Sequence, residues 1–228
     1  MKMPSVPKYR AVLFDLGGTL VKTESPPETF KRILAAHGIH ASVDAIAEVH
    51  EENVRTLDNQ KMAEEGTTFW LRWNTRILEQ IGVKRNVDTL AKRISEVWWD
   101  HANPETYPDV IDTLIRLKAK GVKLGIVTNG FKEDVDQILH RLRLKGYFEV
   151  GIGADACKKA KPDAEIFLFA LDKLGVRAEE TLFVGDDVKK DYEGAKRAGL
   201  RALLVDRDGS VPQNREIIRS LVEVLEYV

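Results

Sequence analysis

Three polar side chains follow apolar stretches that are typical of buried strands. They are Asp15 after Arg10–Phe14, Thr128 after Val122–Val127, and Asp186 after Thr181–Val184 and Gly185. A carboxylate at the end of a buried segment is costly unless it has a partner. Because parallel strands bind ligands at their carboxyl ends, we expect these side chains to meet at one edge of a sheet. A carboxylate there can act as a nucleophile.

Further residues around these positions suit phosphate and metal chemistry. Gly17 and Gly18 follow Asp15, and glycines let the backbone approach a ligand and direct N–H groups at it. Asp187 and Asp191 follow Asp186 closely, and crowded carboxylates repel one another unless a cation lies among them. Oxygen ligands of this kind favour Mg²⁺.

Each of these segments also has a purely structural interpretation. Thr128-Asn129-Gly130 is a common turn sequence at the end of a strand. Asp191 could instead be the N-cap of a helix. Lys161 precedes a proline and a predicted helix, but Lys158 and Lys159 lie so near that spacing alone does not select one lysine.

The chain divides into two patterns. No convincing strand occurs between about Ser25 and Ala102, where we expect helices at Ser25–Leu34, Val43–Leu57, Thr68–Ile81 and Val87–Ala102. From Tyr107 on, helices alternate with short apolar strands, and a last helix is predicted from about Asn214. Such alternation favours a parallel sheet covered on both faces. We expect an α/β core formed by residues 1–21 and 104–228, with a helical insert at 22–103.

Composition excludes several classes of function. The 228 residues carry a net charge of −1, which gives no general attraction to nucleic acid. Cys157 is the single cysteine, so an intramolecular disulfide is impossible. We find no apolar run of membrane-spanning length and no signal-peptide pattern at the start. We therefore expect a cytoplasmic protein without a membrane or nucleic-acid partner; the oligomeric state is open.

The ordered motifs resemble the haloacid dehalogenase-like superfamily of aspartate-nucleophile hydrolases. The resemblance runs from Arg10 to the strand near Val205 and implies a Rossmann-like parallel sheet core with an inserted all-helical cap domain. It implies hinges near Leu20–Ser25 and His101–Pro108. The resemblance implies that Asp15 is the nucleophile and that Lys161 neutralises charge beside it. It implies phosphate contacts from Gly17, Gly18, Thr128 and Asn129. It also implies Mg²⁺ held by Asp15, the Gly17 carbonyl and Asp186, with Asp187 or Asp191 further from the ion.

One position departs from the pattern of the resembled phosphatases. They usually carry an acid–base aspartate two residues after the nucleophile, and here that residue is Gly17. The acidic cluster still favours a Mg²⁺-dependent phosphatase acting on a small phosphorylated metabolite, with Glu24 as a candidate proton donor. A 2-haloacid dehalogenase and a non-catalytic phosphometabolite-binding protein are the alternatives that Gly17 leaves open.

Overall fold

The computed structural model describes residues 8–212 and 215–228 and divides into two compact units. The first unit consists of Met1–Lys22 and Glu105–Val228, and the second of Thr23–Pro104.

The first unit contains a six-stranded parallel sheet with the order β5-β4-β1-β6-β7-β8. The strands are β1 (Ala11–Phe14), β4 (Lys123–Val127), β5 (Val150–Ile152), β6 (Thr181–Gly185), β7 (Arg201–Val205) and β8 (Ile217–Ile218). β1 and β6 are buried along their whole length, as expected for strands covered on both faces. The predicted fold class, an α/β core with a parallel sheet, is confirmed.

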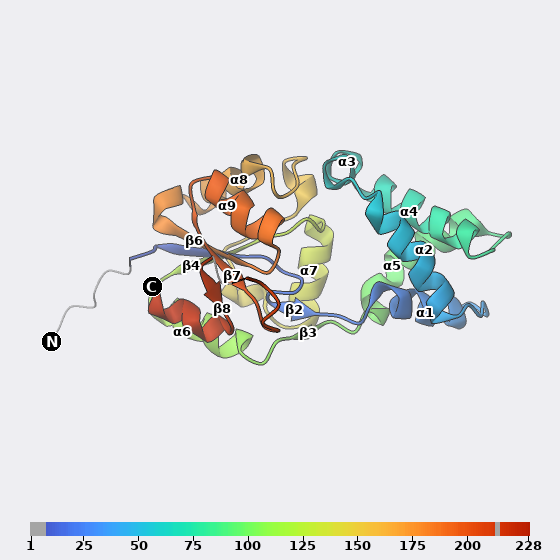
Figure 1. Ribbon diagram of the computed structural model, residues 1–228, viewed down its shortest axis with the longest axis horizontal. Helices are drawn as coiled ribbons and strands as arrows, with labels where there is room; N and C mark the ends of the chain where they lie inside the picture. The colour runs from blue at the N-terminus through green and yellow to red at the C-terminus, as the bar shows by residue number, and fades with distance from the viewer. Residues whose placement is uncertain (1–7, 213–214) are drawn as a thin grey trace. The chain divides into compact units, whose positions relative to one another are not determined.

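Helices cover both faces of this sheet. Figure 1 shows α8 and α9 on one side of the strands and α6 on the other. The helices of the unit are α6 (Val110–Ala119), α7 (Lys132–Arg141), α8 (Ala164–Leu174) and α9 (Gly194–Arg197), with a π-helix at Val188–Glu193 and 3₁₀ helices at Lys145–Tyr147, Ala154–Ala156, Ala178–Glu180 and Leu221–Glu226.

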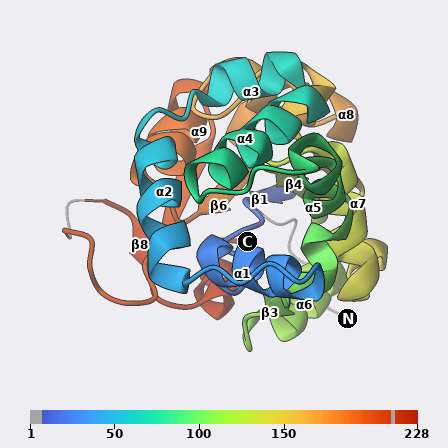
Figure 2. The same ribbon diagram turned by 90° about the vertical axis from the view of Figure 1, so that its right-hand side faces the viewer.

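The second unit is a bundle of five helices, which can be followed in Figure 2. They are α1 (Pro26–Ala36), α2 (Val43–Arg55), α3 (Asn59–Glu65), α4 (Thr67–Gln80) and α5 (Val87–His101). Ser25 caps α1 by accepting a hydrogen bond from the Glu28 amide. Trp73 and Trp98 are partly buried and pack against the apolar core of this bundle.

The sequence analysis did not predict four short elements of the structure. Strands β2 (Val21–Lys22) and β3 (Glu105–Thr106) pair antiparallel where only connections were expected. Helix α3 fills a stretch that was left without structure, because it has seven residues and too few apolar positions to show a period. β5 was missed for the same reason: three residues cannot display alternation.

The end of the chain also differs from the prediction. The helix expected from about Asn214, a residue outside the described ranges, is wrong over Ile217–Ile218, because this dipeptide pairs as β8 with β7. Further along, Leu221–Glu226 forms a 3₁₀ helix, which Ser220 and Glu223 cap. Among the described residues, no helix has both the length and the apolar character needed to cross a membrane.

Candidate active site

Three neighbouring strands bring the predicted polar residues to one edge of the sheet. β1 lies between β4 and β6, and Asp15, Thr128 and Asp186 directly follow these three strands. The Asp15 amide donates to the Val184 carbonyl at 2.9 Å, which continues the strand pairing up to the site. The expectation that strand ends gather these residues agrees with this order.

Lys161 forms a buried ion-pair network with two aspartates. Its Nζ lies 2.5 Å from Asp15 Oδ1 and 2.6 Å from Asp191 Oδ1. The side chains of Lys161 and Asp191 are each 2% exposed and that of Asp15 is 10% exposed. A buried charge requires such partners, so the structure selects Lys161 over Lys159, whose ammonium forms surface ion pairs with Asp163 and Glu165.

Asn129 contacts the backbone of Lys161. Its Oδ1 accepts from the Lys161 amide at 2.7 Å, and its Nδ2 donates to the Lys161 carbonyl at 3.0 Å. The side chain is therefore engaged in holding Lys161, although the sequence suggested a phosphate contact. Thr128 Oγ1 accepts from the Gly130 amide at 3.2 Å. In the described part of the chain this hydroxyl is recorded only as an acceptor, so its hydrogen can be donated to a ligand.

The acidic cluster consists of Asp15, Asp186 and Asp191, which bring one oxygen each to within 4.8 Å of one another. Asp187 lies outside it. The Asp187 carboxylate accepts from the Lys189 and Lys190 amides at 2.9 and 2.8 Å and caps the π-helix Val188–Glu193. The helix-cap interpretation considered for Asp191 is therefore wrong, because Asp187 is the cap.

Glycines make room for two of these carboxylates. Gly18 has a φ of +79°, and a Cβ there would lie 2.3 Å from Asp186 Oδ2. At Gly185 a Cβ would lie 2.5 Å from the side chain of Asp191. Only glycine fits either position. In contrast, a Cβ at Gly17 meets no atom of the described residues within 4 Å, chain neighbours aside, and its φ lies outside the left-handed region.

The loop after Asp15 closes on itself. The Gly18 amide donates to the Val21 carbonyl at 2.8 Å, and the Val21 amide donates to Leu16 at 2.9 Å. The Gly18 N–H is thus donated within the loop, and a phosphate contact at Gly18 stays a prediction. Neither of these bonds uses the Gly17 amide, which keeps its predicted place as a backbone donor.

Sequence reasoning missed Thr19. This residue is fully buried, and its hydroxyl donates to Asp186 Oδ1 at 3.1 Å. A threonine in the turn after the nucleophile position was the available signal, but nothing in the spacing links it to Asp186.

The pKa values of the clustered side chains depart from their ordinary values. Burial, together with the Asp191 and Asp186 carboxylates, raises the pKa of Asp15 to about 7 despite the opposing effect of Lys161. Burial opposes the charge of Lys161, but Asp15 and Asp191 outweigh it and raise the pKa of Lys161 above its ordinary value. Desolvation and Asp191 also raise the pKa of Asp186. Three carboxylates face one ammonium, so the cluster is short of positive charge.

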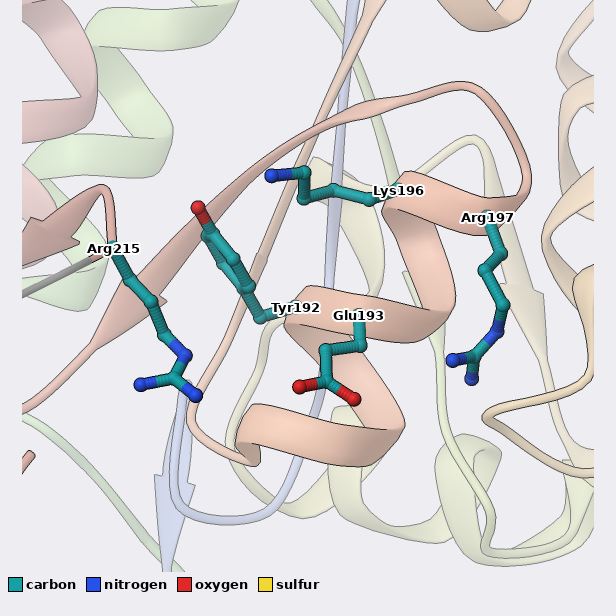
Figure 3. A pocket seen from close by; sticks show the side chains of 5 residues that line it. All are labelled: Tyr192, Glu193, Lys196, Arg197 and Arg215. Carbon is teal, nitrogen blue, oxygen red and sulfur yellow. The ribbon is translucent and has the colours of Figure 1, made fainter.

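A pocket of about 360 Å³ also lies on this unit, and its lining includes neither Lys161 nor any of the three clustered aspartates. Tyr192, Glu193, Lys196, Arg197 and Arg215 line it (Figure 3). Lys196 lies over the Tyr192 ring at 4.9 Å, and Arg197 donates to the Pro162 carbonyl at 3.2 Å. The pocket has no counterpart of the acidic cluster, so we place the candidate chemistry at Asp15.

Comparison with known proteins agrees with the fold. The family described as haloacid dehalogenase-like hydrolase matches residues 9–199. The chain is 32% identical over 204 residues to a glyceraldehyde 3-phosphate phosphatase of Methanopyrus kandleri, covering 87% of this chain and 84% of the relative. It is 29% identical to the (S)-2-haloacid dehalogenase 4A of Burkholderia cepacia, covering 91% and 87%.

A solved structure agrees with this assignment. The chain aligns with the HAD phosphatase from Thermococcus onnurineus at a TM-score of 0.63 and 30% identity, covering 95% of this chain and 96% of that one. The chain therefore belongs to the haloacid dehalogenase-like hydrolases, and it is a hydrolase.

Proposed function

We propose that this hydrolase is a Mg²⁺-dependent phosphatase that acts on a small phosphorylated metabolite through an aspartyl-phosphate on Asp15. The observation that carries the proposal is the buried contact of Asp15 with Lys161 inside a cluster of three aspartates. Glyceraldehyde 3-phosphate phosphatases and phosphoglycolate phosphatases among the relatives support this substrate class.

The donor set fits Mg²⁺. Asp15, Asp186 and Asp191 offer oxygens within 4.8 Å of one another, and their negative charge exceeds that of the single Lys161 ammonium. Asp15 and Asp186 would hold the ion, with the Gly17 carbonyl as a further oxygen. Asp191 contacts Lys161 directly, which favours a role in orienting it. When bound, Mg²⁺ would neutralise charge on the phosphate group.

The side chains of the core supply the remaining steps. An Asp15 oxygen attacks phosphorus and forms an acyl–phosphate bond while the bond from phosphorus to the ester oxygen breaks. Lys161, Thr128 and the Gly17 amide would donate to the phosphoryl oxygens, where negative charge is concentrated. Water then attacks the phosphorus of the intermediate, which releases inorganic phosphate and restores the Asp15 carboxylate.

Proton transfer is the unusual feature of this site. The leaving alkoxide and the attacking water both need a proton carrier, and Gly17 has no side chain to serve. Glu24 was the sequence-based candidate, but hydrogen bonds from Arg32 and Asn103 hold the pKa of Glu24 below its ordinary value. Glu24 is therefore ionised at neutral pH and unsuited to donate a proton. We expect slow turnover of alkyl phosphates.

We propose that the helical unit is the cap domain and that it governs substrate choice. Its place in the chain supports this: it leaves the core at Thr23, close after the loop that follows Asp15, and returns at Glu105.

The test is hydrolysis of an aryl phosphate by the purified chain. Chelation should remove activity and added Mg²⁺ should restore it. Asp186→Asn should abolish the metal-dependent rate, whereas Asp187→Asn should keep most of it, because Asp187 caps a helix outside the cluster. Full activity after verified metal removal would reject the proposal.

A 2-haloacid dehalogenase remains the second candidate, because displacement of halide by Asp15 needs no leaving-group proton and Gly17 supplies none. The dehalogenase relative of Burkholderia cepacia supports keeping it. Halide release from a 2-haloacid by the metal-free protein would favour it over the phosphatase.

A further inference from the structure

Arg207 lies two residues beyond β7 and makes several contacts at once. Its NH1 and NH2 groups donate to the two oxygens of Asp109 at 2.9 and 3.1 Å. The NH2 group also donates to the Thr19 carbonyl at 3.0 Å, and the guanidinium lies over the Tyr107 ring at 3.9 Å. An arginine fork held on three sides has a fixed orientation.

Asp109, the partner of this arginine, is itself held in place by hydrogen bonds. The Ser220 hydroxyl and the Leu221 amide each donate to Asp109 Oδ2 at 2.8 Å. The side chains of Arg207 and Asp109 are only 19% and 14% exposed. Asp109 therefore fixes the position of the Arg207 guanidinium. The guanidinium in turn holds the Thr19 carbonyl through its hydrogen bond.

Thr19 connects this arginine to the acidic cluster. Its carbonyl accepts from Arg207, and its hydroxyl donates to Asp186 Oδ1 at 3.1 Å. The hydrogen bond from Thr19 restrains the rotamer of the Asp186 side chain. Hydrogen-bond partners of metal ligands orient those ligands and tune metal affinity.

We propose that Arg207 is a positioning residue for the metal site: it holds Thr19 so that the Thr19 hydroxyl orients Asp186. The proposal rests on the proposed function, in which Asp186 binds Mg²⁺. The recorded contacts of Arg207 are with Asp109, Thr19 and Tyr107, so its effect on Asp186 would pass through Thr19.

The chain contains a matched control at the other end of the same strand. Arg201 also pairs with a carboxylate, that of Glu216, at 2.8 and 2.6 Å, and its guanidinium also lies over a tyrosine ring, that of Tyr227, at 4.9 Å. Its recorded side-chain contacts include neither Thr19 nor Asp186. Loss of Arg201 thus reproduces the loss of an ion pair and a stacking contact without touching the metal site.

The experiment is calorimetric titration of the full chain with Mg²⁺ alone. Arg207→Ala and Thr19→Val should each weaken Mg²⁺ binding by about 10–100-fold, the usual effect of removing a partner of a metal ligand. The double variant should bind Mg²⁺ no more weakly than the weaker-binding single variant. Both changes remove the same restraint on Asp186, so their effects should not add. Arg201→Ala should keep wild-type Mg²⁺ affinity.

A second variant guards against loss of folding. Arg207→Lys keeps a charge opposite Asp109 but loses the planar fork, so it should fold and still bind Mg²⁺ more weakly than wild type. It replaces Arg207→Ala in the cycle if that variant does not fold.

The outcomes separate the two proposals. Wild-type Mg²⁺ affinity in the folded Arg207 variant, or fold-changes that simply multiply in the double variant, would overturn the role of Arg207. Mg²⁺ binding that is absent from wild type, or unaffected by Asp186→Asn, would overturn the proposed function and this inference with it.

Discussion

Asn129 and Lys161 hold each other through two hydrogen bonds that join a side-chain amide to a backbone peptide. The Lys161 amide donates to Asn129 Oδ1 at 2.7 Å and Asn129 Nδ2 donates to the Lys161 carbonyl at 3.0 Å. Because Lys161 lies 32 residues further along the chain, this pair fixes the lysine beside the end of β4. We therefore expect the position of the Lys161 ammonium next to Asp15 to depend on this pair.

Asn129→Ala should therefore lower both stability and rate. Loss of the two bonds leaves the Lys161 peptide without its partner and should reduce the free energy of unfolding by about 1–3 kcal/mol. The turnover number for an aryl phosphate should fall more than the Michaelis constant changes. Urea unfolding and steady-state kinetics measure both; an unchanged rate would mean that Lys161 is held without Asn129.

Gly17 and Gly18 should respond oppositely to the same substitution. Gly18→Ala forces a Cβ to within 2.3 Å of Asp186 Oδ2 at a φ of +79°, so Mg²⁺ binding and activity should be lost. Gly17→Ala meets open space and should keep both. Calorimetric titration with Mg²⁺ and the melting temperature of each variant provide the comparison. Equal behaviour of the two variants would contradict the loop geometry.

Gly17→Asp should raise the steady-state rate. The open space at Gly17 admits a side chain, and a general acid–base group is worth up to roughly 10²–10⁴-fold when it reaches the leaving group. Stopped-flow kinetics with an aryl phosphate should show a burst in the parent protein and none in the variant. A folded variant without a gain, beside a parent without a burst, would mean that another residue already carries the proton.

Asp109 should make stability depend on pH in the acid range. Burial opposes its charge, but hydrogen bonds from Arg207, Leu221 and Ser220 outweigh that effect and hold the pKa of Asp109 below its ordinary value. A lowered folded-state pKa gives stability that is present above the unfolded value of about 3.9 and is lost as the pH falls below it.

The measurement for Asp109 is urea unfolding between pH 3 and pH 7. Asp109→Asn should be less stable than wild type by about 2–4 kcal/mol at pH 7, and the difference should shrink below about pH 4. Asp112→Asn on the same helix serves as the control, because the Asp112 side chain is 64% exposed and its pair with Arg116 lies on the surface. A difference independent of pH would reject the charge-based explanation.

Strand ends were the part of the site that the sequence could predict. Apolar runs before Asp15, Thr128 and Asp186 implied parallel strands, and parallel strands end at one edge of a sheet. The choice between Asp187 and Asp191 could not be predicted, because the π-helix Val188–Glu193 does not follow a period of 3.6 residues. The contact between Thr19 and Asp186 joins residues 167 positions apart, and no local pattern encodes it.

Asp15 is proposed to carry the phosphoryl group, and this intermediate can be trapped chemically. The Mg²⁺-loaded protein is mixed with an aryl phosphate, quenched during the burst and reduced with borohydride, which converts an aspartyl-phosphate to homoserine; peptide mass spectrometry then locates the change. We expect homoserine at position 15 after exposure to substrate, and none in protein that was not exposed to substrate. Turnover without any modification of Asp15, or with the modification at another carboxylate, would contradict it.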